Sequence, residues 1–219
     1  MKRAYIGSEF DTAISISSKG TLLIAGVDEV GRGALFGPVV AAAVILQASV
    51  AELVEAQIRD SKQLSANRRE ELAKKICACS LAWSIGSASS TEIDQINILQ
   101  ASLLAMRRAV LKLKLKPQLC LVDGNQPILD LAYPQQTLVK GDEKSLSIAT
   151  ASIIAKVWRD DLIVRLATKY SMYDLTANKG YGTARHLQAL KEFGASPLHR
   201  MSFRPCQVDA AAFVGKSGA

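Results

Sequence analysis

The sequence has few of the residues that usually bind transition metals. Its 219 residues include two histidines and four cysteines. Cys77 and Cys79 are separated by a single residue, and neither a second cysteine pair nor a nearby histidine completes the spacing of a zinc site. The cysteines therefore indicate small apolar side chains of a reduced protein. If a metal ion binds to this protein, oxygen atoms must be its ligands.

Long apolar runs are also missing. The longest, residues 39–46, has the length of a buried strand, and a membrane-spanning helix needs about 18 apolar residues or more. Residues 1–10 contain basic side chains but no apolar segment of the kind found in secretory signals. We therefore expect a cytoplasmic protein without a membrane partner.

Positive charge is in excess. The sequence contains 27 lysines and arginines against 20 aspartates and glutamates, a formal net charge of +7. Such an excess favours a polyanionic partner such as a nucleic acid. The apolar fraction of 49% is that of an ordinary globular protein. We expect an N-terminal extension at residues 1–20, one domain at 21–205 that includes C-terminal helices, and a tail at 206–219.

Hydrophobic periodicity predicts an α/β fold. Residues 22–30, 38–46 and 81–88 are predicted to form three antiparallel strands, and residues 119–122 and 137–139 to form parallel ones. Helices are predicted at 65–78, 90–114, 144–170 and 183–193, with 52–59 a short helix or loop. Ser65 and either Ser90 or Thr91 are the expected N-caps, and Gly194 is expected to end the last helix. The helix at 90–114 has one apolar stripe, formed by Ile93, Ile96, Leu99, Leu103, Met106 and Val110. The order of these elements predicts a mixed sheet flanked by helices.

Two adjacent acidic residues, Asp28 and Glu29, lie within an otherwise apolar strand. Side chains alternate along a strand, so the two carboxylates face opposite sides of the sheet unless a bulge or the strand end redirects one. A carboxylate on the core side is costly unless it is paired or bound to a metal ion. A salt bridge for Asp28 with an exposed Glu29 explains these two residues equally well.

Two further aspartates follow predicted strands. Asp123 lies at the carboxyl end of a buried strand, where open α/β sheets bind ligands, although an Asp-Gly turn also explains it. Asp142 precedes the long helix and is a candidate N-cap. If the strand ends meet, these residues join Asp28 and Glu29 in one acidic site, which two Mg²⁺ ions would neutralise. Paired hard cations held by carboxylates suit phosphoryl-transfer chemistry.

An ordered set of motifs resembles bacterial ribonuclease HII. The first three are Gly26-Val27-Asp28-Glu29-Val30-Gly31-Arg32-Gly33, Asp60-Ser61-Lys62-Gln63-Leu64-Ser65 and Val122-Asp123-Gly124-Asn125. The next are Lys140-Gly141-Asp142, followed by Ser147-Ile148-Ala149 and Ala151-Ser152-Ile153-Ile154-Ala155-Lys156-Val157. The last are Asn178-Lys179-Gly180-Tyr181-Gly182-Thr183 and His199-Arg200-Met201-Ser202-Phe203. The resemblance covers residues 22–203, nearly the whole chain.

The resemblance implies a ribonuclease H-like fold in which Asp28, Glu29, Asp123 and Asp142 are catalytic and bind two divalent cations, Mg²⁺ or Mn²⁺. It implies hydrolysis on the 5′ side of ribonucleotides, in RNA/DNA hybrids and at single ribonucleotides within duplex DNA. The products would carry 3′-hydroxyl and 5′-phosphate ends, and the role would lie in DNA replication and repair. We expect a monomer; a sliding clamp is a compatible partner that the sequence does not show.

The resemblance also implies substrate contacts. The backbone of Gly31-Arg32-Gly33 would reach the 2′-hydroxyl, the group that distinguishes RNA from DNA; a tight hairpin turn is the alternative. Tyr181 would stack on the deoxyribose after the ribonucleotide, and a core tyrosine is the alternative. Further expected contacts lie in or beside the motifs: Ser61, Lys62, Ser145 and Lys179. Weaker candidates for phosphate contacts are Lys144, Arg185, Arg200 and Arg204. His199 is expected to be structural, with no histidine partner nearby.

Two other functions are compatible with these residues. One is a different two-metal nuclease of similar fold, such as a resolvase-like enzyme, which would need neither the Gly-Arg-Gly motif nor Tyr181. The other is a non-catalytic nucleic-acid binding module, which would need neither Asp28 nor Asp123.

Overall fold

A computed structural model describes residues 22–47, 58 and 65–207 of the chain. Within them a five-stranded mixed sheet has the strand order β3-β2-β1-β4-β5. Its strands are β1 (Ile24–Val30), β2 (Val39–Leu46), β3 (Ser80–Ala88), β4 (Leu119–Asp123) and β5 (Gln135–Leu138). The first three pair antiparallel, whereas β4 runs parallel to both β1 and β5. The predicted mixed sheet is confirmed.

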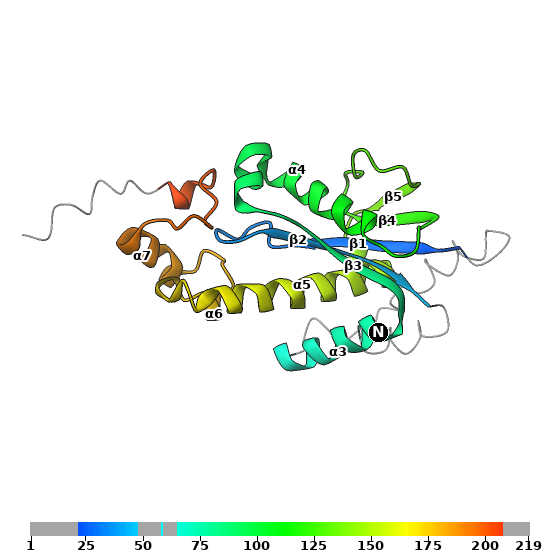
Figure 1. Ribbon diagram of the computed structural model, residues 1–219, viewed down its shortest axis with the longest axis horizontal. Helices are drawn as coiled ribbons and strands as arrows, with labels where there is room; N and C mark the ends of the chain where they lie inside the picture. The colour runs from blue at the N-terminus through cyan, green and yellow to red at the C-terminus, as the bar shows by residue number, and fades with distance from the viewer. Residues whose placement is uncertain (1–21, 48–57, 59–64, 208–219) are drawn as a thin grey trace, which may run out of the picture.

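Helices cover both faces of the sheet. They are α3 (Ala66–Cys79), α4 (Ser90–Leu111), α5 (Leu146–Ala167), α6 (Leu175–Asn178) and α7 (Ala184–Phe193). Short 3-10 turns occupy η3 (Gly141–Glu143), η4 (Ser171–Tyr173) and η5 (Arg204–Cys206). Figure 1 shows α4 on one face, α5 and α3 on the other, and α6 and α7 beyond one end of the sheet. No helix of the described residues is long and apolar enough to cross a membrane.

Two apolar layers sandwich the interior strand β2. Val39, Ala41, Ala43 and Ile45 belong to the core on the α4 side, because alternate residues of a strand share one face. The residues between them pack with α3 and α5. A third core joins the C-terminal helices to Phe36. The sheet is therefore buried on both faces, which explains the nearly continuous apolar sequence of β2.

Close packing places α5 directly over β1. A Cβ atom on Gly26 of β1 would overlap the backbone of Ser147, near the start of α5. Only glycine leaves room for this approach. The helix therefore lies against the strand that carries Asp28 and Glu29.

Helix α4 differs from the prediction. Its N-cap is Ser89 rather than Ser90 or Thr91, and it forms a capping box with Glu92. The helix ends at Leu111, not at residue 114, and Asn97 interrupts it with a φ of 66°. The side chain of Asn97 accepts hydrogen bonds from the backbone of Leu99 and Gln100, so the second part of the helix restarts there. The predicted single apolar stripe is consequently wrong for Ile96 and Leu99, which are both 37% exposed.

The other boundaries move by a few residues. Ser65 caps α3 as predicted. Helix α5 spans Leu146–Ala167 rather than 144–170, and β5 spans Gln135–Leu138 rather than 137–139. Helix α7 ends before Gly194, whose φ is 73°. The expected extension at 1–20, the segment at 52–57 and residues 208–219 of the tail lie outside the described residues.

Candidate active site

Three carboxylates converge at the carboxyl ends of β1 and β4. One oxygen from each of Asp28, Glu29 and Asp123 lies within 4.8 Å of the others. We call these three residues the carboxylate cluster. Parallel pairing of Val27 with Val122 places Asp28 beside Asp123, since each is the next residue of its strand. The carboxyl ends of two strands that are distant in sequence thus form one acidic site.

Adjacent residues Asp28 and Glu29 both reach the cluster despite strand alternation. Glu29 is the last residue but one of β1, where the strand end leaves its longer side chain free to turn. The backbone N–H of Glu29 donates to Asp28 Oδ1 at 2.7 Å, and Gly141 N–H donates to Asp123 Oδ1 at 2.6 Å. These bonds orient the two aspartates. The alternative in which Glu29 is exposed is wrong, because its side chain is 9% exposed and pairs with Arg32 at 3.0 Å.

Burial and mutual repulsion oppose ionisation of the cluster. Burial is the main cause that raises the pKa of Asp28 well above its usual value, and the charge of Glu29 adds to it. Burial likewise raises the pKa of Glu29 and of Asp123. In addition, Glu29 Oε2 is buried and has no hydrogen-bond partner among the described residues. Closely spaced, desolvated carboxylate oxygens with an unused acceptor fit a divalent cation, which prefers such ligands.

Asp142 lies beside the cluster and is not one of its three members. It belongs to η3, and its charge helps to raise the pKa of Asp123, to which its backbone also donates a hydrogen bond. The N-cap of α5 is Ser145, so the interpretation of Asp142 as that cap is wrong. The four predicted acidic residues are therefore brought together, three of them most closely.

The segment formed by residues 31–33 directly follows β1. Gly31 has a φ of 89°, and a Cβ there would overlap the Arg159 side chain, so this position requires glycine. A Cβ on Gly33 would meet no atom within 4 Å. Residues 31–34 do form a turn, in which Ala34 N–H donates to the Gly31 carbonyl at 3.3 Å. It is not a tight hairpin turn between β1 and β2, because eight residues separate these strands and Ala34 bridges to Tyr181. Gly31 is therefore required by the packing of the protein, whereas Gly33 leaves the backbone accessible to a ligand.

Two fully buried arginines hold this loop in place. Arg200 donates to the carbonyl oxygens of Gly31, Arg32 and Gly37. Arg159 donates to the carbonyls of residues 36, 38 and 179. Arg200 was predicted as a phosphate contact, which is wrong, because its side chain is buried and its donors are used inside the protein. The pKa of Arg200 is lowered to about 9, mainly by burial.

Tyr181 lies between Gly180 and Gly182, next to the same loop. Its ring is half-buried and stands over two cations, with Arg159 Cζ at 5.5 Å and Lys156 Nζ at 5.8 Å from the ring centre. It belongs to none of the hydrophobic cores of the described residues. Its partly open ring differs from the fully packed tyrosine of the alternative interpretation.

The remaining predicted contacts have varied surroundings. Ser145 is fully buried and its hydroxyl accepts a hydrogen bond from Ile148 N–H. It therefore caps a helix, and its predicted contact with the substrate is wrong. Lys179 is half-buried beside Tyr181, and its ammonium donates to the Thr176 carbonyl. Lys144 donates to the Val139 carbonyl at 2.7 Å. Ser61 and Lys62 lie outside the described residues.

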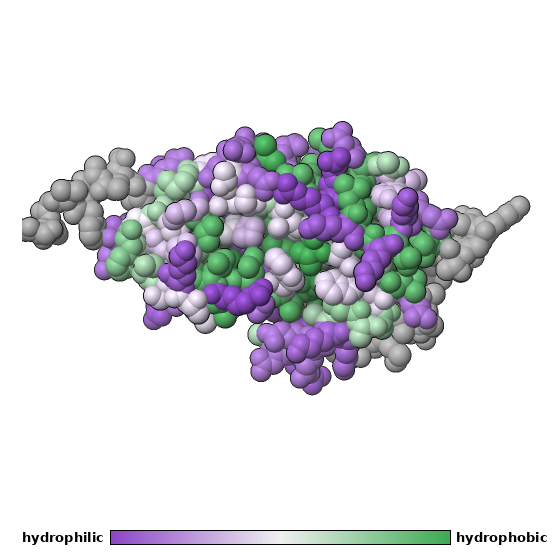
Figure 2. Space-filling view, viewed as in Figure 1, coloured by the Kyte–Doolittle hydropathy of each residue, from purple (hydrophilic) through white to green (hydrophobic). Residues whose placement is uncertain are grey.

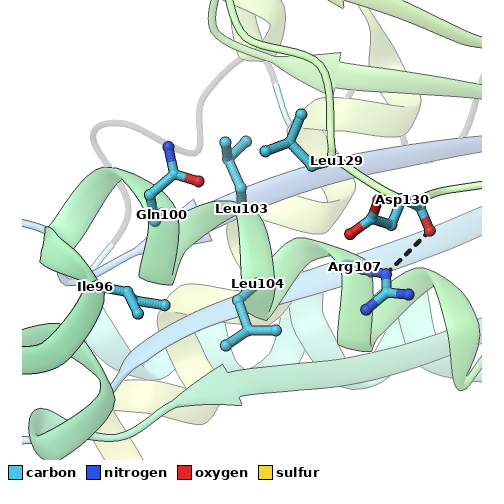
Figure 3. A pocket seen from close by; sticks show the side chains of 7 residues that line it. All are labelled: Ile96, Gln100, Leu103, Leu104, Arg107, Leu129 and Asp130. Carbon is cyan, nitrogen blue, oxygen red and sulfur yellow. Dashed lines mark hydrogen bonds between the residues drawn. The ribbon is translucent and has the colours of Figure 1, made fainter.

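A separate hollow of about 270 Å³ lies between α4 and the loop that follows β4. It is lined by Ile96, Gln100, Leu103, Leu104, Arg107, Leu129 and Asp130 (Figure 3). In Figure 3 the Arg107 side chain points to the backbone of Asp130, to which it donates at 3.1 Å. None of the acidic residues at the ends of β1 and β4 lines it. The hollow is therefore distinct from the carboxylate cluster.

Comparison with known proteins identifies the family. The family model described as ribonuclease HII matches residues 25–206 of the chain. The chain belongs to the ribonuclease HII family. It is accordingly a ribonuclease H, a hydrolase. The two alternatives, a resolvase-like nuclease and a non-catalytic module, are set aside by this membership.

Relatives and solved structures support the assignment over most of the chain. A ribonuclease HII of Trichormus variabilis is 61% identical over 95% of this chain and 98% of its own length. One of Nostoc sp. is 68% identical over 85% and 83%, respectively. The structure of ribonuclease H2 from Pyrococcus horikoshii superposes with a TM-score of 0.73 at 28% identity, covering 84% of this chain and 95% of that one. The Archaeoglobus fulgidus ribonuclease HII, solved in complex with PCNA, gives 0.72 at 29% identity, covering 88% and 100%.

Several residues around the site escaped the sequence analysis. Ser152 of α5 donates a hydrogen bond to Asp28. Arg159 of the same helix is fully buried and donates to three backbone carbonyls, and no local signal distinguishes it from the solvated charges of an amphipathic helix. The expectation that no histidine lies near His199 is wrong, because its Nε2 lies 3.0 Å from Nε2 of His186. The motif around His199 and Arg200 was the available signal, but its local sequence does not reveal what these side chains contact.

Proposed function

We propose that this ribonuclease H hydrolyses the phosphodiester on the 5′ side of ribonucleotides, in RNA/DNA hybrids and at single ribonucleotides in duplex DNA. Water adds to the phosphorus and the 3′-oxygen of the preceding nucleotide leaves, so the products carry a 3′-hydroxyl and a 5′-phosphate. The observation that carries the proposal is the carboxylate cluster placed directly before the open backbone of residues 31–33.

Asp28, Glu29, Asp123 and Asp142 would hold two divalent cations, Mg²⁺ or Mn²⁺. When bound, such ions activate water and stabilise the leaving oxygen in phosphoryl transfer. The protein contributes ligands that are already close together and oriented by backbone N–H groups. Arg32 keeps one oxygen of Glu29 engaged, which leaves the buried Oε2 for the cation.

Recognition of the ribonucleotide is assigned to residues 31–33 and Tyr181. Gly33 leaves its backbone unobstructed, which suits a hydrogen bond with the 2′-hydroxyl. The half-buried ring of Tyr181 lies beside that segment and offers a flat apolar face for the next sugar. Ser61, Lys62 and Lys179 are proposed to contact the phosphate backbone, which positions a duplex without selecting its sequence.

The cellular setting follows from this activity. Removal of ribonucleotides belongs to DNA replication and repair, hence to the cytoplasm of a bacterial cell. We propose that the chain acts as a monomer. A sliding clamp is a candidate partner because the Archaeoglobus fulgidus relative was solved with PCNA.

The decisive experiment compares a DNA duplex containing one ribonucleotide with the same duplex made of DNA alone. We expect a single cut on the 5′ side of the ribonucleotide with Mg²⁺ or Mn²⁺, no cut with a chelator, and an intact all-DNA duplex. Analysis of the product ends would locate the hydroxyl and the phosphate. Equal cleavage of both duplexes would overturn the proposed specificity, and cleavage in the chelator would overturn the metal-dependent mechanism.

A further inference from the structure

The two histidines of the chain form a buried contact pair. His186 lies in α7 and His199 follows it in the next loop, and the exposed fractions of their side chains are 0% and 1%. Their Nε2 atoms are 3.0 Å apart. The rings of Phe36 and Tyr173 pack edge-on against His199, with ring centres at 5.0 and 4.6 Å. We call His186 and His199 the histidine pair.

The hydrogen bonds of this pair fix the position of each ring proton. The backbone N–H of Ser196 points at His199 Nδ1 from 2.9 Å and can only donate, and the Ser196 hydroxyl, also at 2.9 Å, can donate to the same nitrogen. We therefore assign Nδ1 as the acceptor and place the proton of His199 on Nε2. His199 Nε2–H therefore donates to His186 Nε2. The proton of His186 must then lie on Nδ1, which is 2.9 Å from the carbonyl oxygen of Tyr181. Each ring is neutral and has a single tautomer that satisfies all its contacts.

This chain of bonds connects the two segments proposed to recognise the ribonucleotide. At one end it holds the Tyr181 carbonyl. At the other, His199 forms an isolated β-bridge with Phe36, and the next residue, Arg200, donates to the carbonyls of Gly31 and Arg32. These contacts thus connect Tyr181, through both histidine rings and Arg200, to residues 31–33.

We propose that His186 and His199 are positioning residues for ribonucleotide recognition: as a neutral pair with fixed tautomers, they set the place of Tyr181 relative to residues 31–33. This inference rests on the proposed role of Tyr181. Neither ring touches the carboxylate cluster, so the pair affects substrate discrimination rather than the chemistry itself.

Burial supports a neutral pair at pH 7. Removal from water is the largest cause that lowers the pKa of both rings, and the pKa of His199 falls to about 4. A proton added to His186 would turn its Nε2, the acceptor of the pair, into a donor that faces Nε2–H of His199.

The first test observes the protons directly. In ¹⁵N-labelled protein at pH 7, long-range proton–nitrogen spectra of the rings should show His199 protonated on Nε2 and His186 on Nδ1. A proton on Nδ1 of His199, or a doubly protonated ring, would overturn the inference. This readout needs neither substrate nor metal, so it is independent of the proposed function.

The second test measures how firmly the Tyr181 backbone is held. The carbonyl of Tyr181 also accepts from Thr183 N–H, and Tyr181 N–H donates to the Asn178 carbonyl. In His186→Leu we expect hydrogen exchange of the Tyr181 and Thr183 amides to accelerate at least about tenfold. His186→Asn, which keeps a donor near the Nδ1 position, should restore part of the protection.

The matched control for this test is Leu190→Ala. Leu190 is 1% exposed in the same helix, and it belongs to the core that α7 buries. Its substitution destabilises α7 without removing a bond to Tyr181. If this control accelerates exchange of the two amides as much as His186→Leu does, the pair merely stabilises the helix and the inference is wrong.

The third test is a double-mutant cycle on cleavage. His186→Leu should lower kcat/KM at a single ribonucleotide about tenfold, whereas in a Tyr181→Ala background it should change it less than about twofold, because coupled residues are not additive. Equal effects in both backgrounds would overturn the inference. If the wild-type protein cuts no ribonucleotide, the proposed function fails, and the exchange experiment still decides whether the pair holds Tyr181.

Discussion

At the residue scale, each carboxylate of the cluster is held by a neighbour, and Asp28 is also kept from water. Asp28 is 6% exposed, and its usual ionisation is opposed by burial and by Glu29. Such an arrangement is unfavourable for folding alone, because each desolvated charge costs free energy. Divalent cations would offset this cost. Cation binding therefore explains why three carboxylates lie so close together.

The first prediction concerns Asp123. We expect Asp123→Asn to lower kcat at least about 100-fold, a loss of about 2.7 kcal/mol of transition-state stabilisation, because the amide cannot neutralise a cation. Folding and duplex binding should survive, since the change removes a repelling charge beside Asp28. Cleavage rates, thermal unfolding and duplex binding would be measured together. Full activity in this variant would exclude Asp123 as a metal ligand.

The second prediction separates the two glycines of residues 31–33. Gly31→Ala should lower the free energy of unfolding by about 2 to 4 kcal/mol, because its φ is 89° and its Cβ would overlap Arg159. Gly33→Ala should change it by less than about 0.5 kcal/mol, since nothing lies near its Cβ. Denaturant unfolding measures both.

Cleavage completes this comparison. Gly33→Ala should still lower activity on single ribonucleotides, because the new methyl group stands where the sugar is proposed to approach. A stable Gly33→Ala variant with wild-type activity on that substrate would contradict the proposed backbone contact.

At the element scale, α4 illustrates how local signals can override a periodic pattern. Spacings of three and four apolar residues predicted an unbroken helix. Asn97 has a φ of 66° and a ψ of 166°, outside the helical region, and its side chain caps the second part of the helix. The kink interrupts the helical periodicity, and Ile96 and Leu99 on its two sides are partly exposed.

The third prediction tests the packing of α4 on β3. A Cβ on Gly86 would overlap the Ala105 carbonyl and Ala109 N–H of α4. Gly86→Ala should therefore destabilise the protein by about 1 to 3 kcal/mol, while the folded fraction keeps its activity because the acidic residues lie on other elements. Leu81→Ala, at a position of the same strand that is 44% exposed, is the control. Equal stability of Gly86→Ala and wild type would show that the helix can shift.

At the scale of the whole molecule, the formal net charge is +7. Figure 2 shows hydrophilic residues gathered over α3, at the lower edge. That helix exposes acidic as well as basic side chains: Arg68, Glu70, Glu71, Lys74 and Lys75. The net charge therefore supports attraction to a polyanion in general and does not by itself locate the binding face.

The fourth prediction is a loss of stability at acidic pH that depends on the histidine pair. The unfolded chain protonates His199 near pH 6.5, whereas the folded pKa is about 4. Between these values the unfolded state binds more protons, so stability falls as pH is lowered, by at most about 3 kcal/mol from this group. His186 faces His199 directly, and Asp174 is the charged group that acts on His186.

This pH dependence is measured by denaturant unfolding from pH 7 to pH 4. The carboxylates also titrate in this range, so the relevant quantity is the difference between the wild-type and His199→Leu profiles. The variant should have the flatter profile. Parallel profiles would show that His199 does not resist protonation in the folded protein.

The sequence by itself determined the elements whose signals are local. Ser65 caps α3 and Thr183 caps α7, because a hydroxyl before an amphipathic segment satisfies free backbone N–H groups wherever that segment packs. The buried strands were likewise evident from short apolar runs. The ordered motifs identified Asp28 and Asp123 as members of one site and indicated the family.

Only the tertiary structure decided which side chains meet. Asp28 and Asp123 lie 95 positions apart and become neighbours through the register of β1 with β4. Arg159, Arg200 and the histidine pair appear in the sequence as ordinary polar residues. The two arginines are buried against the loop after β1, which offers them its carbonyl oxygens as acceptors. The histidines are buried against each other, with the Tyr181 carbonyl and Ser196 as their further partners. A charged side chain can be buried only where such partners already exist, and their position depends on the packing of the whole chain.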